Sequence, residues 1–417
     1  MSPSYPQSPQ TDAPPAVHVQ VRRRLARMAA HYARGRARTA GSGAPQRILL
    51  IRPDHLGDLL FQSPALHWLR AQRPDAHLTL VIGPWGRPAQ PALAGSYDDL
   101  LEIPFPAFER GSKQNVLARW SMLPRLARQL RRENFDAAIL FRPDHWWGAM
   151  LAAMADIPIR LGYDTPETTP WLTEALPLHH EHSVSSSLLL VGVLLDQQPS
   201  LDPAAHPLRF DLDPASLEET RASLSSLAVD FTRPLVIIHP GAGAAIKLWD
   251  PGKWGEVARR LGQEGCSILI TGGPDEAELT AAVSEASTGR AIDLGGRTTF
   301  AELAALLASS DLVLGPDSGP LNLAVAVGTP TIHLFGPADP VRFGPWGDAT
   351  RHLVLQSDWT CVPCGRFDWP DLPEHGCVRD IAVDAVHDAA QHLLQTKAHS
   401  LGASHFKRPD VAGASHL

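Results

Sequence analysis

Residues 52–58 read Arg-Pro-Asp-His-Leu-Gly-Asp and follow an apolar run that is typical of a buried strand. Pro53 ends that strand, Gly57 permits a tight turn, and a helical pattern begins near Asp58. The aspartate has two interpretations. It is either an N-cap that accepts a hydrogen bond from a free backbone N–H, or a general base that deprotonates a substrate hydroxyl.

A second turn, at 239–249, has features that suit a phosphate group. Gly241 and Gly243 follow a predicted strand and expose backbone N–H groups, and Lys247 adds a positive charge close by. The spacing matches neither a Walker loop nor the dinucleotide-binding glycine pattern. An ordinary surface lysine is therefore the alternative interpretation of Lys247.

A third turn, at 315–322, connects a predicted strand to a predicted helix. Ser318 and Gly319 leave unpaired N–H groups at the start of that helix, where the helix dipole attracts a diphosphate. Capping of the helix by Asp317 or Ser318 is the alternative explanation for these residues.

These three turns need elements to hold them, and the chain alternates strand-like with helix-like segments. Such alternation predicts an α/β fold with doubly wound parallel sheets. The expected strands are 47–52, 77–83, 99–103, 135–141, 235–239, 266–271, 291–294, 311–314 and 331–335. The expected helices are 58–73, 115–133, 146–155, 254–264, 275–286, 300–309 and 319–327. No short internal repeat is expected beyond the likeness of the two halves.

A polar, proline-rich stretch at 194–214 interrupts the alternation and predicts a linker. We expect an N-terminal Rossmann-like domain at 45–205 and a C-terminal one at 206–397, with tails at 1–44 and 398–417. Two such domains place a cleft between the carboxyl ends of their sheets, where all three turns lie.

The composition describes a globular protein, with 44% hydrophobic and 19% charged residues among 417. A signal peptide and membrane-spanning runs are not expected. Four cysteines do not suggest a disulfide scaffold, which favours a reducing cytoplasm. Residues 21–40 carry seven arginines and no acidic residue, with apolar residues at helical spacing. This segment is either a solvated tail or an amphipathic helix on the inner face of the cytoplasmic membrane. Nucleic acid is not an expected partner, because the net charge is −7.

Three of the four cysteines are close together in the sequence: Cys361, Cys364 and Cys377. Their spacing suits a structural Zn or Fe site, for which His375 or Asp380 would supply the fourth ligand. A redox pair or a loop of free thiols is the alternative.

The ordered set of motifs resembles glycosyltransferase family 9, which contains the ADP-heptose:lipopolysaccharide heptosyltransferases. The similarity covers about residues 46–390. The motifs are R-P-D-H-L-G-D at 52–58, S-P-A-L at 63–66, H-P-G-A-G at 239–243, K-L-W at 247–249, K-W at 253–254, G-G-P at 272–274, D-L-G-G at 293–296, G-P-D-S-G-P at 315–320, G-T-P at 328–330 and L-F-G at 334–336.

The resemblance implies a GT-B fold, with two Rossmann-like domains facing a cleft, and transfer of a sugar with inversion. By the same resemblance Asp58 is the general base on the acceptor hydroxyl, and Lys247 contacts the donor diphosphate. The turn containing Asp317, Ser318 and Gly319 lies against the donor. Gly241 and Gly243 are further donor-side candidates. No cofactor is required for such a reaction.

Arg52, Asp54 and His55 are candidates for shaping the acceptor side, although His55 has an ordinary loop histidine as its alternative. Two departures concern the donor sugar. Asn322 stands where many heptosyltransferases have a histidine, and two alanines, at 244–245, replace hydroxyl or charged residues.

The expected reaction is transfer of a heptose or similar sugar from ADP-heptose to a lipopolysaccharide core-type glycan. A family member that heptosylates an autotransporter-type protein is one alternative, and the cysteine loop favours it. A catalytically inactive sugar-nucleotide-binding protein is another, and the presence of both Asp58 and Lys247 counts against it. A sugar-nucleotide epimerase would need more acid/base residues in the cleft.

Overall fold

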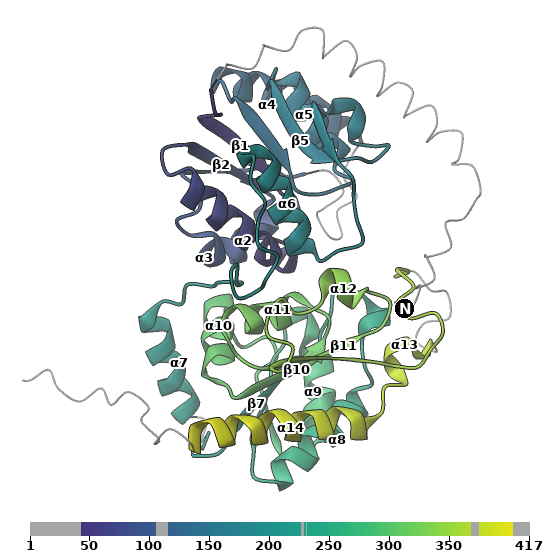
Figure 1. Ribbon diagram of the computed structural model, residues 1–417. Helices are drawn as coiled ribbons and strands as arrows, with labels where there is room; N and C mark the ends of the chain where they lie inside the picture. The colour runs from purple at the N-terminus through teal and green to yellow at the C-terminus, as the bar shows by residue number, and fades with distance from the viewer. Residues whose placement is uncertain (1–42, 106–115, 227–228, 231, 368–374, 403–417) are drawn as a thin grey trace, which may run out of the picture.

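The computed structural model describes residues 43–105, 116–226, 229–230, 232–367 and 375–402 (Figure 1). The first half contains β1 (Arg47–Ile51), α2 (Leu56–Gln72), β2 (His77–Ile82), η1 (Pro84–Ala89), α3 (Gln90–Leu93), β3 (Asp99–Glu102), α4 (Val116–Arg132), β4 (Ala137–Leu140), α5 (Trp146–Met154), β5 (Ile159–Tyr163), η2 (Thr169–Trp171), β6 (Glu174–Leu176) and α6 (Ser183–Leu195). The second half contains α7 (Pro214–Ser226), β7 (Leu235–Ile238), η3 (Ala245–Lys247), α8 (Pro251–Gln263), β8 (Ser267–Ile270), η4 (Pro274–Glu276), α9 (Ala277–Ala286), β9 (Ala291–Asp293), α10 (Phe300–Ser309), β10 (Leu312–Pro316), α11 (Gly319–Ala326), β11 (Thr331–Phe335), α12 (Pro340–Phe343), β12 (His352–Gln356), α13 (Gly376–Arg379) and α14 (Val383–Gly402).

Each half forms one six-stranded parallel sheet, and the two sheets have the same topology. The strand orders are β3-β2-β1-β4-β5-β6 and β12-β11-β10-β7-β8-β9. In each sheet the order reverses between two central strands, β1 and β4 in the first and β7 and β10 in the second. Ligands of open α/β sheets bind beyond the carboxyl ends of the strands at such a switch point. The turns at 52–58, 239–249 and 315–322 follow three of these four strands.

Both faces of each sheet are covered, because the strands alternate between two apolar cores. Ile48 and Leu50 of β1 pack in one core with α2 and α6, whereas Leu49 and Ile51 pack in the other with α4 and α5. The second sheet is covered by α8 and α14 on one face and by α7, α10 and α11 on the other. Strands that are apolar on both faces are typical of parallel sheets between helices.

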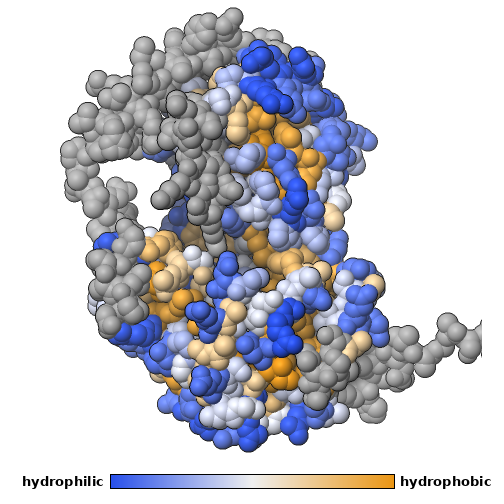
Figure 2. All heavy atoms as spheres, turned by 180° about the vertical axis from the view of Figure 1, so that it is seen from behind, coloured by the Kyte–Doolittle hydropathy of each residue, from blue (hydrophilic) through white to orange (hydrophobic). Residues whose placement is uncertain are grey.

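The two halves contact each other through α2 and α11. Leu60 of α2 packs in the same apolar cluster as Leu321 and Leu323 of α11. At the helix starts the backbones approach closely, since a Cβ placed on Gly57 would lie 3.4 Å from the Cα of Gly319. From behind, the molecule is hydrophilic at both outer ends, with apolar surface nearer the middle (Figure 2).

The doubly wound α/β prediction is confirmed, and the expected strands are present with shifts of one or two residues at their ends. Several elements that complete the sheets or cover them were not expected, among them β5, β6, α6, α7, β12 and α14. The C-terminal expectation needs correction, because α14 continues to Gly402, past the expected boundary at 397. The sequence of this segment is polar overall, but it forms a helix that packs one apolar stripe against α8. Residues 21–40 lie outside the described part of the chain.

Candidate active site

Asp58 lies in the first turn of α2 and does not cap it. The helix begins at Leu56, and the N-cap residue is His55, which makes no side-chain capping bond. The Asp58 carboxylate instead accepts a hydrogen bond from Arg52 Nη2 at 3.1 Å, and 36% of its side chain is exposed. The capping interpretation is therefore wrong, because the carboxylate turns to a buried guanidinium.

The surroundings of Asp58 make its carboxylate a stronger base than an ordinary aspartate. Burial raises the pKa of Asp58 from 3.8 to about 6, and the negative charge of Asp54 adds to the rise. Arg52 and Arg142 oppose it. A group with a pKa near 6 is ionised at pH 7 and accepts a proton more readily than one with a pKa near 4.

The three residues expected on the acceptor side occupy different positions. Arg52 and Asp54 are buried, with 6% and 2% of their side chains exposed, and Arg52 pairs with Asp58 while Asp54 pairs with Arg52. His55 keeps partial exposure, and its ring centroid lies 5.8 Å from that of Trp85. Of the three, His55 alone has a surface that an acceptor can contact.

Lys247 and Asp317, which were predicted to lie on the donor side, form an ion pair across the second switch point. The Nζ atom lies 2.5 Å from Oδ2 of Asp317, and the side chains are 18% and 10% exposed. On its other side Lys247 Nζ lies 5.2 Å from the ring centroid of Phe367, in the cysteine loop. The alternative interpretation of Lys247 as an ordinary surface lysine does not fit this arrangement, because its ammonium group is held at the end of β10.

Ser318 is the N-cap residue of α11, and Gly319 is the first residue of that helix. The Ser318 hydroxyl makes no capping bond. Ser318 Oγ and Asn322 Oδ1 are buried and have no hydrogen-bond partner within the described part of the chain. Unpaired buried polar atoms are costly, and a ligand at the helix start would satisfy them.

The glycine-rich turn has one close-packed glycine and one exposed glycine. A Cβ on Gly241 would collide with the carboxylate of Glu276, whereas Gly243 is exposed. Glu276 accepts a hydrogen bond from Gly273 N at 2.7 Å. Sequence reasoning missed Glu276. At the edge of the predicted donor site a carboxylate would suit ribose hydroxyls, and its position after Gly-Gly-Pro was the available signal.

Arg142 was missed as well, and the signal for it was a short repeat. The tetrapeptide Arg-Pro-Asp-His occurs at 52–55 and again at 142–145. The two copies follow β1 and β4, which are neighbours at the first switch point. The expectation that the chain holds no short repeat is therefore wrong, and side-chain contacts join the two copies.

The cysteine loop brings two potential metal ligands together. Cys361 Sγ lies 3.6 Å from His375 Nε2, and the charges of Cys361 and Cys364 act on Cys377, whose pKa is raised to about 11 mainly by burial. Asp380 instead accepts a hydrogen bond from Trp359 Nε1 at 2.9 Å. In the described ranges no three His, Cys, Asp or Glu side chains converge as a metal group. Residues 368–374, inside this loop, lie outside those ranges.

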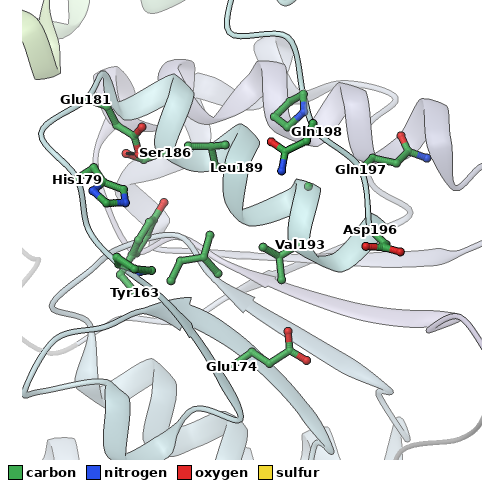
Figure 3. Close-up of a pocket in the computed structure, with 14 residues that line it drawn as sticks. Tyr163, Glu174, His179, Glu181, Ser186, Leu189, Val193, Asp196, Gln197 and Gln198 are labelled. Carbon is green, nitrogen blue, oxygen red and sulfur yellow. Dashed lines mark hydrogen bonds between the residues drawn. The ribbon is translucent and has the colours of Figure 1, made fainter.

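A cavity of about 570 Å³ lies beside the first sheet, between β6 and α6 (Figure 3). Leu189 and Val193 form its apolar side, and its lining includes the carboxylates of Glu174, Glu181 and Asp196 but no lysine or arginine. Such a lining does not suit a diphosphate. The lining also includes none of the charged residues at the two switch points.

Comparison with known families shows which family the chain belongs to. Residues 123–366, more than half of the chain, match the family model described as glycosyltransferase family 9 (heptosyltransferase). The chain belongs to glycosyltransferase family 9. The matched range includes every donor-side candidate, while Asp58 precedes it. The protein is thus a glycosyltransferase, and the two sheets are the Rossmann-like halves of a GT-B fold.

Relatives in the family agree with this. The chain is 27% identical over 308 residues to lipopolysaccharide heptosyltransferase 3 of Escherichia coli, which covers 70% of this chain and 84% of that protein. The structure of E. coli ADP-heptose lipopolysaccharide heptosyltransferase II has a TM-score of 0.65 at 20% identity, covering 84% of this chain and 99% of that one. The iron-containing dodecameric glycosyltransferase TibC of enterotoxigenic E. coli has a TM-score of 0.51 at 16% identity, covering 85% and 80%. These structural likenesses concern the fold.

Proposed function

We propose that this enzyme transfers a heptose or similar sugar, with inversion, from a nucleoside diphosphate donor to a lipopolysaccharide core-type glycan. ADP-heptose is the donor that the family's named relatives favour. In this proposal residues 45–205 bind the acceptor and residues 206–397 bind the donor. The observation that carries it is the approach of Gly57 to Gly319, which brings the base and the start of α11 together.

The chemistry follows from that juxtaposition. Asp58 takes the proton of the acceptor hydroxyl as the oxygen attacks the anomeric carbon from the face opposite the leaving group. The bond from the anomeric carbon to the diphosphate oxygen breaks, and the nucleoside diphosphate leaves with that electron pair. Lys247 and the N–H groups at the start of α11 stabilise the negative charge on the leaving group. One base and one stabilised leaving group are sufficient for inversion.

The test is incubation of the wild type with a panel of nucleotide sugars, ADP-heptose included, and a heptose-deficient lipopolysaccharide core acceptor. We expect acceptor-dependent release of nucleoside diphosphate with the ADP-sugar above the UDP- and GDP-sugars. The product's anomeric configuration, determined by NMR, reports inversion. Binding of a donor without any transfer would support the inactive-protein alternative, and no binding of any nucleotide sugar would refute the transferase proposal.

Membrane contact belongs to this proposal as well. Among the helices in the described ranges, none has the length and apolar content needed to span a bilayer. The arginine-rich residues 21–40 would supply attraction to an anionic membrane surface, where a lipopolysaccharide precursor is available at the inner face.

We propose in addition that Cys361, Cys364, Cys377 and His375 hold a structural Zn or Fe ion. Ligand distances of about 2.3 Å to sulfur and 2.05 Å to nitrogen place tetrahedral S and N ligands about 3.6 Å apart. The contact between Cys361 Sγ and His375 Nε2 is 3.6 Å. Three thiolates and an imidazole are a donor set that zinc and iron accept.

Metal analysis of protein purified without a His tag is expected to find one Zn or Fe per chain. Cys361→Ser should lose the metal. Cys266→Ser should retain it, because Cys266 lies directly before β8 and outside the cysteine loop. A metal content well below one per chain in the wild type would show that the loop carries free thiols.

A further inference from the structure

The two copies of Arg-Pro-Asp-His form one chain of alternating charges that ends on the base. Arg142 pairs with Asp144 through Nε at 2.6 Å and with Asp54 through Nη1. Asp54 lies 2.7 Å from Arg52 Nε, and Arg52 reaches Asp58 at 3.1 Å. These ion pairs can form because the carboxyl ends of β1 and β4 are adjacent in a parallel sheet.

Arg52 is held from three directions. It forms an ion pair with Asp54, and it donates hydrogen bonds from Nη2 to Asp58 and from Nη1 to the carbonyl oxygen of Phe141 at 2.6 Å. The planar guanidinium therefore has a fixed orientation, and it fixes one oxygen of Asp58 with it. Removing such charges from water costs more than an ion pair usually returns, so stability alone does not explain the arrangement.

We propose that Arg52 and Asp54 are positioning residues for the base: Arg52 orients the Asp58 carboxylate, and Asp54 shares the charge of Arg52 so that Asp58 remains free to take a proton. This proposal rests on the proposed function and extends it. Arg142 completes this network of charges, because it forms an ion pair with Asp54 on the side of the network away from Asp58. The Arg142 side chain is 34% exposed.

The balance of charges explains why both residues are needed. Arg52 by itself would stabilise the ionised carboxylate of Asp58 and weaken it as a base. Asp54 opposes this effect and, after burial, is the second cause of the raised pKa of Asp58. An aspartate that is both oriented and basic thus requires the pair, not either residue alone.

The other groups around Asp58 do not oppose the effect of Arg52 on its pKa as Asp54 does. Arg142, from the loop after β4, lowers the pKa of Asp58. Burial lowers the pKa of His145 to about 4, so its ring is neutral at pH 7. From α11 the residues that approach Gly57 are Gly319 and Asn322, which carry no charge. On the donor side Lys247 is paired with Asp317.

The test is the pH profile of kcat, with both substrates saturating, for Asp54→Asn and Arg52→Gln. We expect the acidic limb to move to lower pH in Asp54→Asn and to higher pH in Arg52→Gln. Both variants should lose about 10- to 100-fold in kcat, the cost of a misplaced reacting group, with little change in the donor KM. A merely structural role does not produce opposite shifts.

If the variants of the buried residues Arg52 and Asp54 fail to fold, Arg142→Gln provides the test, because the Arg142 side chain is partly exposed. Its acidic limb should move to higher pH. Arg47→Gln is the matched control, since Arg47 forms an ion pair with Glu133 at 3.2 Å on the same domain. Folding is checked by circular dichroism and thermal unfolding.

The proposal is overturned if folded Asp54→Asn and Arg52→Gln shift the limb in the same direction or not at all, or if folded Arg142→Gln leaves it in place. These outcomes leave the proposed function intact as long as the wild type transfers sugar and Asp58→Asn does not. Failure of the wild type with every donor would instead refute the proposed function.

Discussion

Replacing Asp58 with asparagine is expected to lower the rate of sugar transfer by about 10²- to 10⁴-fold, the usual contribution of a positioned general base. Asparagine has nearly the same shape, and its oxygen can still accept the hydrogen bond from Arg52 Nη2. It cannot take a proton from the acceptor hydroxyl. The measurement is kcat with saturating donor and acceptor.

The matched control is Asp99→Asn, because Asp99 is an exposed aspartate of the same domain that pairs with His77. Its kcat should equal that of the wild type. Wild-type activity should fall as the pH drops through about 6, where Asp58 becomes protonated, and the residual activity of Asp58→Asn should lack this limb. Full activity in folded Asp58→Asn would assign the proton transfer to another group.

The same substitution is expected to stabilise the protein above pH 6. The folded-state pKa of Asp58 is raised from 3.8 to about 6, so folding favours the protonated form. Below 3.8 both states are protonated and the carboxylate has no effect. Between 3.8 and 6 its cost grows, and above 6 the cost is complete. Thermal unfolding should therefore show a higher Tm for Asp58→Asn at pH 8 and no difference near pH 3.5.

Loss of activity together with a gain in stability separates a missing base from a damaged fold. Functional groups held in unfavourable surroundings commonly lower stability in this way. A lower Tm in Asp58→Asn at pH 8 would contradict the assignment, because it would mean that the ionised carboxylate is a net stabilising partner of Arg52.

Much of the fold could be predicted from the sequence, because each central strand is a short apolar run that ends in a proline- or glycine-containing turn. The position of Asp58 at the first switch point followed from this pattern. β5 was missed since Arg160 and Gly162 interrupt its apolar run, and Arg160 is buried by hydrogen bonds to the carbonyl groups of Trp171 and Ile157. Three-residue β6 is too short for a periodic signal.

The candidate site was predictable in its residue types but not in its contacts. The sequence places Arg52 and Asp54 beside Asp58, and only the adjacency of β1 and β4 shows that Arg142 completes the network. Likewise the pairing of Lys247 with Asp317 joins positions 70 residues apart. Distances of this kind depend on the order of strands in the sheet, which local periodicity does not contain.

Lys247→Ala is expected to reduce kcat/KM for the donor by about 10²- to 10³-fold, as for the loss of one group that stabilises a developing negative charge. The ammonium group has three donors, so it can hold Asp317 and still bind an oxygen of the diphosphate. The alanine variant loses this charge and leaves the Asp317 carboxylate unpaired beside an anionic ligand. Isothermal titration with the nucleoside diphosphate should show weaker binding, and kcat should fall as well.

Lys253→Ala is the informative control, because Lys253 is a second lysine of the same domain with a different task. Its Nζ donates to the carbonyl oxygens of Arg379 at 2.5 Å and Ile381 at 3.1 Å, which ties α8 to the segment before α14. Its loss should lower Tm and leave nucleotide affinity nearly unchanged, whereas Lys247→Ala should do the reverse. If both variants lost affinity and stability together, Lys247 would be a structural residue, and stabilisation of the leaving group would fall to the N–H groups at the start of α11.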